Sequence, residues 1–239
     1  MSSTATPRHV LGDIVGGKVL DVATGAGGFV SYLLEGLQSF DEIVGIDVSD
    51  KGRQAFSEAF ADKPNVSFEV MDGHALKFAR SSWDTVAISN SLHHFEDPRP
   101  VLDEMWRVLK PGGAFIVFEM YRDRQSPAQL THVWLHHWAA DLDRSQGIVH
   151  RHTYRRTDLV DLVGGLSLDP VRTAEISDTV ADPKDEATMA WHESLIERQL
   201  DRAGGDRRLV RSGERVRQRL RDVGIQGATE LLFVGRKPA

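Results

Sequence analysis

Short apolar runs alternate with amphipathic stretches along the first half of the chain. Each run is bounded by turn or polar residues and is apolar on both faces, as in the buried strands of parallel sheets. Helical spacing of apolar residues follows several runs, with Ser49 as a candidate N-cap and a stop signal at Lys110-Pro111-Gly112-Gly113. The pattern predicts strands over residues 18–23, 42–47, 65–72, 83–90 and 114–120. Their alternation with helices predicts an α/β fold with a Rossmann-like, doubly wound sheet.

This rhythm ends after Tyr121. Residues 121–152 are polar and rich in histidine, a helical pattern follows, and two further strands are predicted over 167–177 and 229–237. We therefore expect one domain over residues 1–239, with a core at 15–120, a substrate lid at 121–155 and a helical insertion at 183–222.

Composition narrows the range of functions. The 239 residues include 35 Asp and Glu against 29 Lys and Arg, a net charge of −6, and no cysteine. The absence of cysteine excludes disulfides, thiol nucleophiles and thiolate metal sites. The acidic balance disfavours a nucleic-acid binder. Because no apolar run approaches the roughly 20 residues of a membrane span, and residues 1–13 lack the apolar segment of a signal peptide, we expect a cytoplasmic protein.

A glycine-rich loop follows the first predicted strand, in the sequence VLDVATGAGGF. Gly25 and Gly27 allow a tight turn and the close approach of a ligand to a helix N-terminus. Asp47 ends the second strand, where a carboxylate can accept hydrogen bonds from a ribose diol. Together these features predict a nucleoside-binding site.

Two residues distinguish between possible nucleosides. Val30 stands where a dinucleotide-binding fingerprint has glycine or alanine. Asp21 lies at the mouth of the loop, where it would repel a pyrophosphate and attract a sulfonium or ammonium group. The alternative is that Asp21 only caps the loop backbone.

Five successive motifs carry a family resemblance: DVATGAG, GID, MDGHAL, WDTVAISNSLHHFEDP and EMWRVLKPGG. They resemble class I S-adenosylmethionine-dependent methyltransferases, in particular the subgroup similar to ubiquinone and menaquinone biosynthesis enzymes (methyltransferase type 11-like). The resemblance covers residues 15–120, and Ala23 departs from it because the family more often has glycine there. It implies a seven-stranded, mostly parallel sheet whose last strand is antiparallel. It also implies methyl transfer from S-adenosylmethionine to oxygen, nitrogen or carbon of a small molecule, with S-adenosylhomocysteine as product.

The resemblance also implies roles for individual residues. The methionine portion of the cofactor would lie against the glycine loop, the ribose against Asp47 and the adenine against Val48. Asp72-Gly73 is also an ordinary turn pair, and Asn90 is also a candidate loop cap. The implied cofactor residues are Asp21, Ala23, Gly25, Gly27, Asp47, Val48, Asp72, Gly73, His74 and Asn90.

Side chains at the ends of the fourth and fifth strands are candidates for the chemistry. His93 and His94 follow the fourth strand, and Glu119 and Tyr121 lie at the end of the fifth. A histidine is suited to removing a proton near neutral pH. His93 and His94 are therefore candidate catalytic residues, although a structural role at a helix start, or a role beside the cofactor, is favoured.

A second group of histidines comprises His132, His136, His137, His150 and His152. Helical spacing places His132 and His136 on one face, where His150, His152, Asp141 or Asp143 could complete a metal site. The glutamate of a hydrolytic zinc motif is missing, and we assign no metal from the sequence. A substrate lid is favoured over a chance surface cluster. Within it, and with Glu119 and Tyr121, the candidate substrate contacts are Trp134, Trp138, Arg151 and Tyr154.

Residues 197–222 carry nine arginines against five acidic residues. This stretch lacks the aromatic residues that stack on bases, so a solvated helix face or a homodimer contact is favoured over RNA. Two other functions stay open for the whole chain. One is an NAD(P)-dependent Rossmann oxidoreductase, and the other is a non-catalytic S-adenosylmethionine-binding module.

Overall fold

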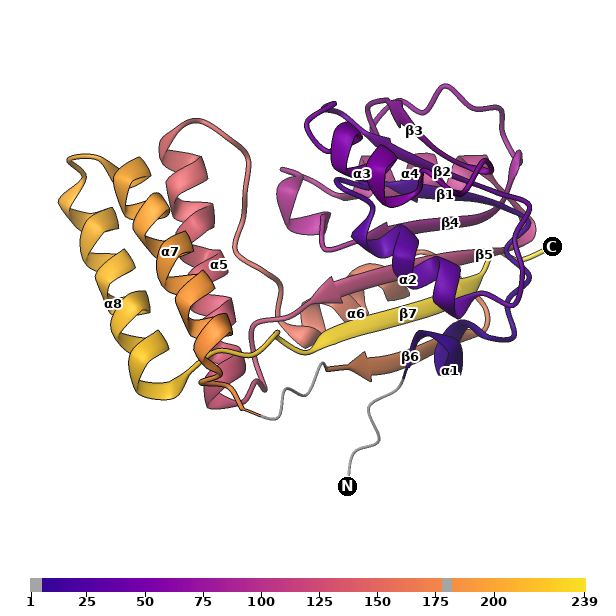
Figure 1. Ribbon diagram of the computed structural model, residues 1–239. Helices are drawn as coiled ribbons and strands as arrows, with labels where there is room; N and C mark the ends of the chain where they lie inside the picture. Colours follow the sequence, from indigo (N-terminus) through magenta and orange to yellow (C-terminus); the bar gives the residue numbers. More distant parts are fainter. Residues whose placement is uncertain (1–5, 178–181) are drawn as a thin grey trace.

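A seven-stranded sheet organises the computed structural model, which describes residues 6–177 and 182–239 (Figure 1). The strand order is β3-β2-β1-β4-β5-β7-β6. Strands β1 to β5 run parallel, and β7 is antiparallel to both β5 and β6. The predicted mostly parallel sheet with an antiparallel last strand is confirmed. The strands are β1 (Lys18–Val22), β2 (Glu42–Asp47), β3 (Val66–Val70), β4 (Trp83–Ser89), β5 (Leu109–Met120), β6 (Val171–Ile176) and β7 (Glu230–Arg236).

Helices cover both faces of the sheet because neighbouring residues on each strand point to opposite sides. In β5, Phe115 and Val117 pack in the layer of α4 (Arg99–Val108) and α6 (Arg156–Gly164). Ala114, Ile116 and Phe118 pack in the layer of the opposite helices. These are α1 (Pro7–Leu11), α2 (Gly28–Gly36) and α3 (Arg53–Ala59). Both core layers are apolar, as the uninterrupted strand sequences predicted.

The helix expected from Ser49 begins later than predicted. Helix α3 starts at Arg53 with Gly52 as its N-cap, and the Ser49 hydroxyl accepts a hydrogen bond from the Lys51 amide instead. A Cβ at position 52 would lie 2.2 Å from the Gly25 carbonyl oxygen. The turn before α3 thus lies in close contact with the glycine loop. Residues 48–52 belong to this turn and not to the helix.

Three long helices form a separate layer beside the sheet: α5 (Pro127–Ser145), α7 (Glu186–Ala203) and α8 (Arg207–Val223) (Figure 1). Gly204 and Gly205 lie in the break between α7 and α8. The ring of Trp138 is buried at their centre, and its Nε1 donates to the Leu209 carbonyl at 2.9 Å. Helix α5 begins with a capping box between Ser126 and Gln129, a sequence signal that the polar composition of residues 121–152 had obscured.

Ion pairs hold much of the arginine-rich surface of α8. Arg217 and Arg221 both pair with Glu193 of α7, at 3.4 and 2.6 Å. The guanidinium of Arg219 lies 4.8 Å from the ring centre of Trp134. These contacts agree with the expected solvated face and are made within one chain. In the described part of the chain, no helix combines the length and apolar character needed to cross a bilayer.

Candidate functional site

The glycine loop joins β1 to α2. Glycine is suited to positions 25 and 27 for different structural reasons. Gly27 has a φ of 86°, and a Cβ there would lie 2.5 Å from the ring of Phe60. Gly25 has a φ of 54°, and no described atom lies within 4 Å of a Cβ built on it. Gly27 therefore permits packing against α3, whereas Gly25 leaves an open surface. We expected both to serve ligand approach, and the crowding at Gly27 corrects that interpretation for one of them.

Asp47, at the end of β2, braces the loop. Its Oδ2 accepts from the Gly25 amide at 3.0 Å, and its Oδ1 accepts from the Ser49 amide at 3.0 Å. The two strands are neighbours in the sheet, which brings the carboxylate to the loop. Each carboxylate oxygen has a further lone pair for a hydroxyl donor.

Asp21 is buried at the other side of the loop with one unsatisfied oxygen. Its Oδ2 accepts from the Thr24 hydroxyl at 2.6 Å, whereas its buried Oδ1 has no hydrogen-bond partner among the described residues. Burial, with a smaller contribution from the Asp47 charge, raises the pKa of Asp21 to about 7. Capping of the loop accounts for only one oxygen. Because buried polar atoms nearly always have partners, Oδ1 is suited to a ligand that donates N–H groups.

A cavity of about 550 Å³ opens over the loop. Val48 is 72% exposed above it, and Met71 and Phe95 add apolar surface suited to a flat ring. Its volume falls in the range of small-molecule sites. The lining is Val22, Ala23, Gly25, Asp47, Val48, Met71, Asp72, Gly73, His74, Ser91, His94 and Phe95.

Seven of the expected cofactor residues are in this lining. Asp72 is held by its neighbour, since its Oδ1 accepts from the His74 amide at 2.9 Å, and this bond lowers its pKa. The lining residues Val22, Met71, Ser91 and Phe95 were not predicted. Val22 ends β1, and the other three follow β3 or β4 within a few positions, so their places at strand ends were the available signal.

Asn90 lies outside the lining and joins three strands instead. Its Nδ2 donates to Glu230 of β7, and its Oδ1 accepts from the Met120 amide of β5 at 2.8 Å. Its own amide donates to the Phe118 carbonyl at 2.8 Å. We expected Asn90 to line the cofactor near its reactive end. In the structure its side chain instead links β5 and β7 through hydrogen bonds at the edge of the sheet.

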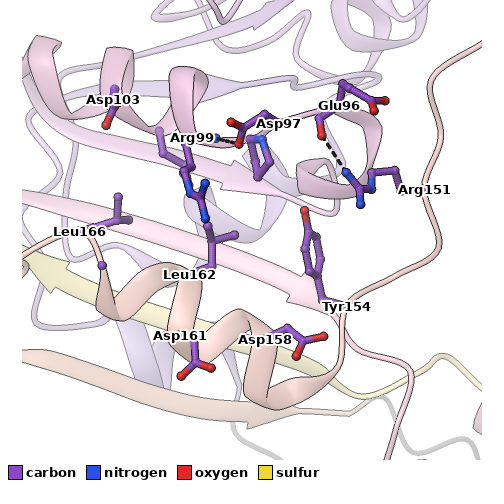
Figure 2. A pocket seen from close by; sticks show the side chains of 13 residues that line it. Glu96, Asp97, Arg99, Asp103, Arg151, Tyr154, Asp158, Asp161, Leu162 and Leu166 are labelled. Atoms are coloured by element: carbon purple, nitrogen blue, oxygen red, sulfur yellow. Dashed lines mark hydrogen bonds between the residues drawn. The ribbon is translucent and has the colours of Figure 1, made fainter.

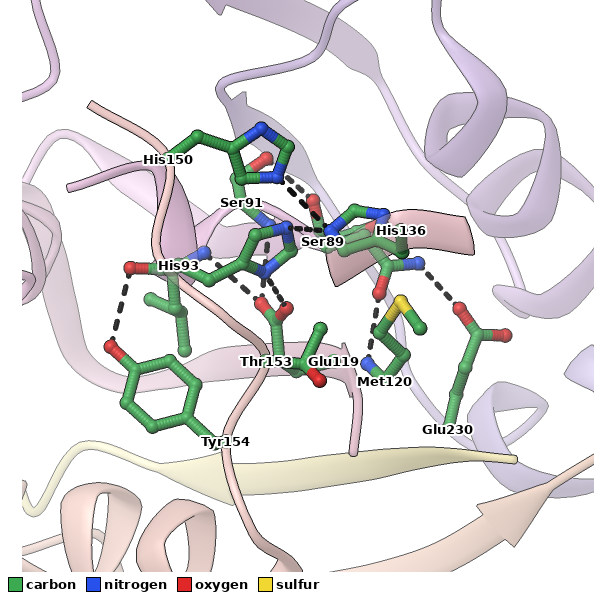
Figure 3. Close-up of polar contacts among 12 residues, drawn as sticks. Ser89, Ser91, His93, Glu119, Met120, His136, His150, Thr153, Tyr154 and Glu230 are labelled. Atoms are coloured by element: carbon green, nitrogen blue, oxygen red, sulfur yellow. Dashed lines mark hydrogen bonds and ion pairs between the residues drawn. The ribbon is translucent and has the colours of Figure 1, made fainter. Parts of the chain in front are cut away.

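The histidines after β4 lie in a short helix, η1 (Leu92–His94), and point in different directions. His93 is fully buried, and its Nδ1 lies 2.6 Å from Oε1 of the buried Glu119 (Figure 3). The other Glu119 oxygen accepts from the Ser91 and Leu92 amides, both at 3.1 Å. Glu119 thus faces protein groups rather than a substrate. His94 instead reaches the cavity, and burial lowers its pKa to about 3, which keeps its imidazole neutral.

Comparisons with known proteins agree with the resemblance read from the five motifs. Residues 20–117 match a family model described as a methyltransferase domain. The chain is 31% identical over 111 residues to demethylmenaquinone methyltransferase of Lactococcus lactis, covering 46% of this chain and 44% of that protein. It is 36% identical to the enzyme of the same name from Renibacterium salmoninarum, covering 50% and 49%. The chain thus spans about half the length of the curated relatives it matches.

A solved structure shares the fold over nearly the whole chain. The YcgJ protein of Bacillus subtilis superposes with a TM-score of 0.58 at 20% identity, covering 93% of this chain and 92% of that one. This likeness extends the shared fold beyond the matched domain, to the strands that close the sheet.

The structure separates the six expected substrate residues. Arg151 and Tyr154 line a second cavity of about 810 Å³ between α4 and α6, which includes no described residue of the glycine loop (Figure 2). Trp138 and Tyr121 are buried in the protein core, and the ring of Trp134 lies on the surface under Arg219. Glu119 is the sixth, and it is bonded to His93. The smaller cavity, unlike the larger one, joins the glycine loop to Asp47 and Asp72 in one lining.

Proposed function

We propose that the chain transfers a methyl group from S-adenosylmethionine to oxygen, nitrogen or carbon of a small-molecule acceptor and releases S-adenosylhomocysteine. The observation that carries the proposal is the unpartnered buried oxygen of Asp21 beside the loop that Asp47 braces. One carboxylate offers a partner to a cation, and the other offers acceptors to a diol. The pyrophosphate of a dinucleotide is anionic, and a carboxylate beside the loop would repel it.

Each portion of the cofactor has matching residues. Asp21 would hold the ammonium group, the open backbone at Gly25 would adjoin the methionine portion, and Asp47 would accept from the ribose. Val48, Met71 and Phe95 would contact the adenine, with Asp72 and the Gly73-His74 backbone at its polar edge. When bound, the cofactor supplies an electrophilic methyl group on a sulfonium.

The protein's part in the reaction is mainly positioning. Displacement at a sulfonium has a good neutral leaving group, so orientation supplies much of the rate. His94 reaches the cavity as a neutral imidazole and can accept a hydrogen bond from the O–H or N–H of the acceptor, whereas its pKa of about 3 makes it a weak base. His93, held by Glu119, orients η1 and thereby His94.

The acceptor side is built by residues outside the matched segment. The methyltransferase family model matches residues 20–117, and residues 121–155 and helices α7 and α8 lie beyond it. We therefore propose a small-molecule acceptor without naming it, with residues 121–155 as its lid. A cytoplasmic location, a homodimer contact on α8 and the absence of a nucleic-acid partner belong to the same proposal.

Calorimetric titration with S-adenosylmethionine, S-adenosylhomocysteine and NAD tests the cofactor. We expect micromolar binding of the first two and none of NAD. Binding of NAD, or of none of the three, would overturn the proposal. Release of S-adenosylhomocysteine that depends on an added acceptor then separates an enzyme from a non-catalytic binding module.

A further inference from the structure

Three imidazole rings from distant segments meet beside the cofactor cavity. His93 comes from η1, His136 from α5, and His150 from the segment that returns from α5 to the sheet (Figure 3). The Nε2 atom of His136 lies 3.0 Å from Nε2 of His93 and 3.1 Å from Nε2 of His150. The same ring atom of each histidine thus points to one place.

The opposite nitrogens of the two outer rings are fixed by carboxylates. His93 Nδ1 lies 2.6 Å from Glu119, and His150 Nδ1 lies 2.7 Å from Asp143. Both carboxylates are themselves anchored, Glu119 by two backbone amides and Asp143 by Arg202 at 2.7 Å. Each ring therefore donates from Nδ1, which leaves a lone pair on its Nε2. Carboxylates orient metal-binding histidines in this way.

Hydrogen bonds alone do not account for the two short contacts between Nε2 atoms. If His136 carries a proton on Nε2, that proton cannot lie along both contacts at once. If it does not, both outer rings must become imidazolium ions to donate to it. Burial opposes such charges, because His93 and His150 lie in the protein interior, where an ion loses its hydration. One divalent cation would instead accept all three lone pairs.

We propose that His93, His136 and His150 bind one divalent transition-metal ion of the zinc type through their Nε2 atoms. Two nitrogens on a tetrahedral zinc, each about 2.0–2.1 Å from the metal, lie about 3.3 Å apart. The two contacts of 3.0 and 3.1 Å are close to this spacing, and all three ligand atoms lie within 4.8 Å of one another. Three protein ligands leave a fourth position for water or a substrate atom, as in catalytic zinc sites.

The other histidines of the second group do not join this site. His132 Nδ1 accepts from the Ala228 amide at 2.9 Å. His152 contacts Asp141 at 3.0 Å and stacks on His137. Asp143 contacts His150 Nδ1 through Oδ2 and accepts a hydrogen bond from Arg202 through Oδ1, so both of its oxygens are engaged away from the site. His132 and His136 therefore have different partners, and the third ligand, His93, comes from the first half of the chain.

The site adjoins the proposed methyl-transfer centre. The ring of His94, which lines the cofactor cavity, lies 4.5 Å from that of His93 and 4.1 Å from that of His150, centre to centre. An acceptor oxygen at the fourth metal position would lose its proton more readily and become a better nucleophile. This consequence, unlike metal binding itself, rests on the proposed function.

Metal uptake by the full chain tests the site. Protein purified without a histidine tag is stripped with a chelator, reloaded with Zn²⁺, desalted and analysed by elemental mass spectrometry. We expect about one zinc per chain, and we expect Co²⁺ to give the intense visible absorption of a four-coordinate ion. His136→Ala removes the half-buried ligand and should abolish uptake, whereas His137→Ala, at the neighbouring half-buried histidine, should retain it. Glu119→Gln should weaken binding about 10- to 100-fold because it removes the carboxylate that orients His93.

A folded wild-type protein that takes up no zinc would overturn the site, as would equal uptake by His136→Ala. If His136→Ala fails to fold by circular dichroism, the cobalt spectrum of the wild type decides. The titration with S-adenosylmethionine is read separately. Zinc uptake without cofactor binding would contradict only the proposed function, and cofactor binding without zinc uptake would contradict only the metal site.

Discussion

The cofactor half and the helical layer of this protein place their important side chains by different means. In the cofactor half, Asp21, Asp47 and Asp72 lie in or directly after strands, and the sheet brings the strand ends together. In the helical layer, Trp138 bonds to Leu209, 71 positions away, and His136 meets His93, 43 positions away. The order of residues along the chain thus predicts where the three aspartates lie. The contacts of Trp138 and His136 depend instead on how the helices pack.

Trp138→Ala would test whether the helical layer is needed for the cofactor site. Loss of a large buried side chain should cost about 3–5 kcal/mol of unfolding free energy. Because Trp138 packs among α5, α7 and α8, S-adenosylmethionine affinity should change by less than about twofold in the protein that stays folded. Chemical denaturation and calorimetry measure the two quantities. Trp134→Ala, on the exposed face of α5, is the control and should cost under about 1 kcal/mol. A large loss of affinity with Trp138→Ala would show that the two regions are not independent.

Asp47→Ala should instead weaken cofactor binding and leave the packing of the three long helices unchanged. The ribose hydroxyls and the Gly25 amide would lose an acceptor, and hydrogen bonds to a charged group contribute about 1.5–3 kcal/mol each. We expect S-adenosylmethionine to bind at least about 100-fold more weakly by calorimetry. Asp50→Ala, three positions on and exposed, should bind normally. Unchanged affinity in Asp47→Ala would remove this residue from the cofactor site.

Gly27→Ala and Gly25→Ala would distinguish the packing role of Gly27 from the cofactor-binding role proposed for Gly25. Both residues have positive φ, but only at position 27 would the new methyl group meet the Phe60 and Phe56 rings. Gly27→Ala should therefore lower the unfolding free energy by about 1–3 kcal/mol more than Gly25→Ala, through overpacking. Gly25→Ala should act mainly on cofactor affinity. Equal losses of stability by denaturant titration would contradict this division.

Asp21 predicts a pH dependence of cofactor binding. Its pKa of about 7 means that the carboxylate is half protonated at neutral pH before the cofactor binds. Because the cationic cofactor prefers the ionised form, affinity should rise about tenfold between pH 6 and a plateau above pH 8. The same raised pKa means that the folded state binds more protons than the unfolded state, so this group destabilises the fold as pH rises from about 4 to 7. Asp21→Asn should remove the pH dependence, weaken binding and raise the melting temperature at pH 8 by a few degrees. A flat affinity profile for the wild type would contradict the assignment.

The histidines show where prediction from the sequence ended. The pairing of His132 with His136 followed from helical spacing alone, and the structure directs these two rings to different partners. Trp138 was a candidate substrate contact because it lies in the expected lid, and Tyr121 because it lies at the end of the fifth strand, but both are buried. The capping box of Ser126 and Gln129 was available in the sequence and would have predicted the start of α5.

The sequence by itself predicted the strands of the sheet and seven of the residues that line the cavity over the glycine loop. It could do so because strand periodicity and loop chemistry act over a few positions, and parallel strands bring their ends to one edge. Tertiary structure alone decided the meeting of His93, His136 and His150, and the division of Gly25 from Gly27. Those contacts depend on side chains from separate elements reaching the same point in space, which no spacing along the chain specifies.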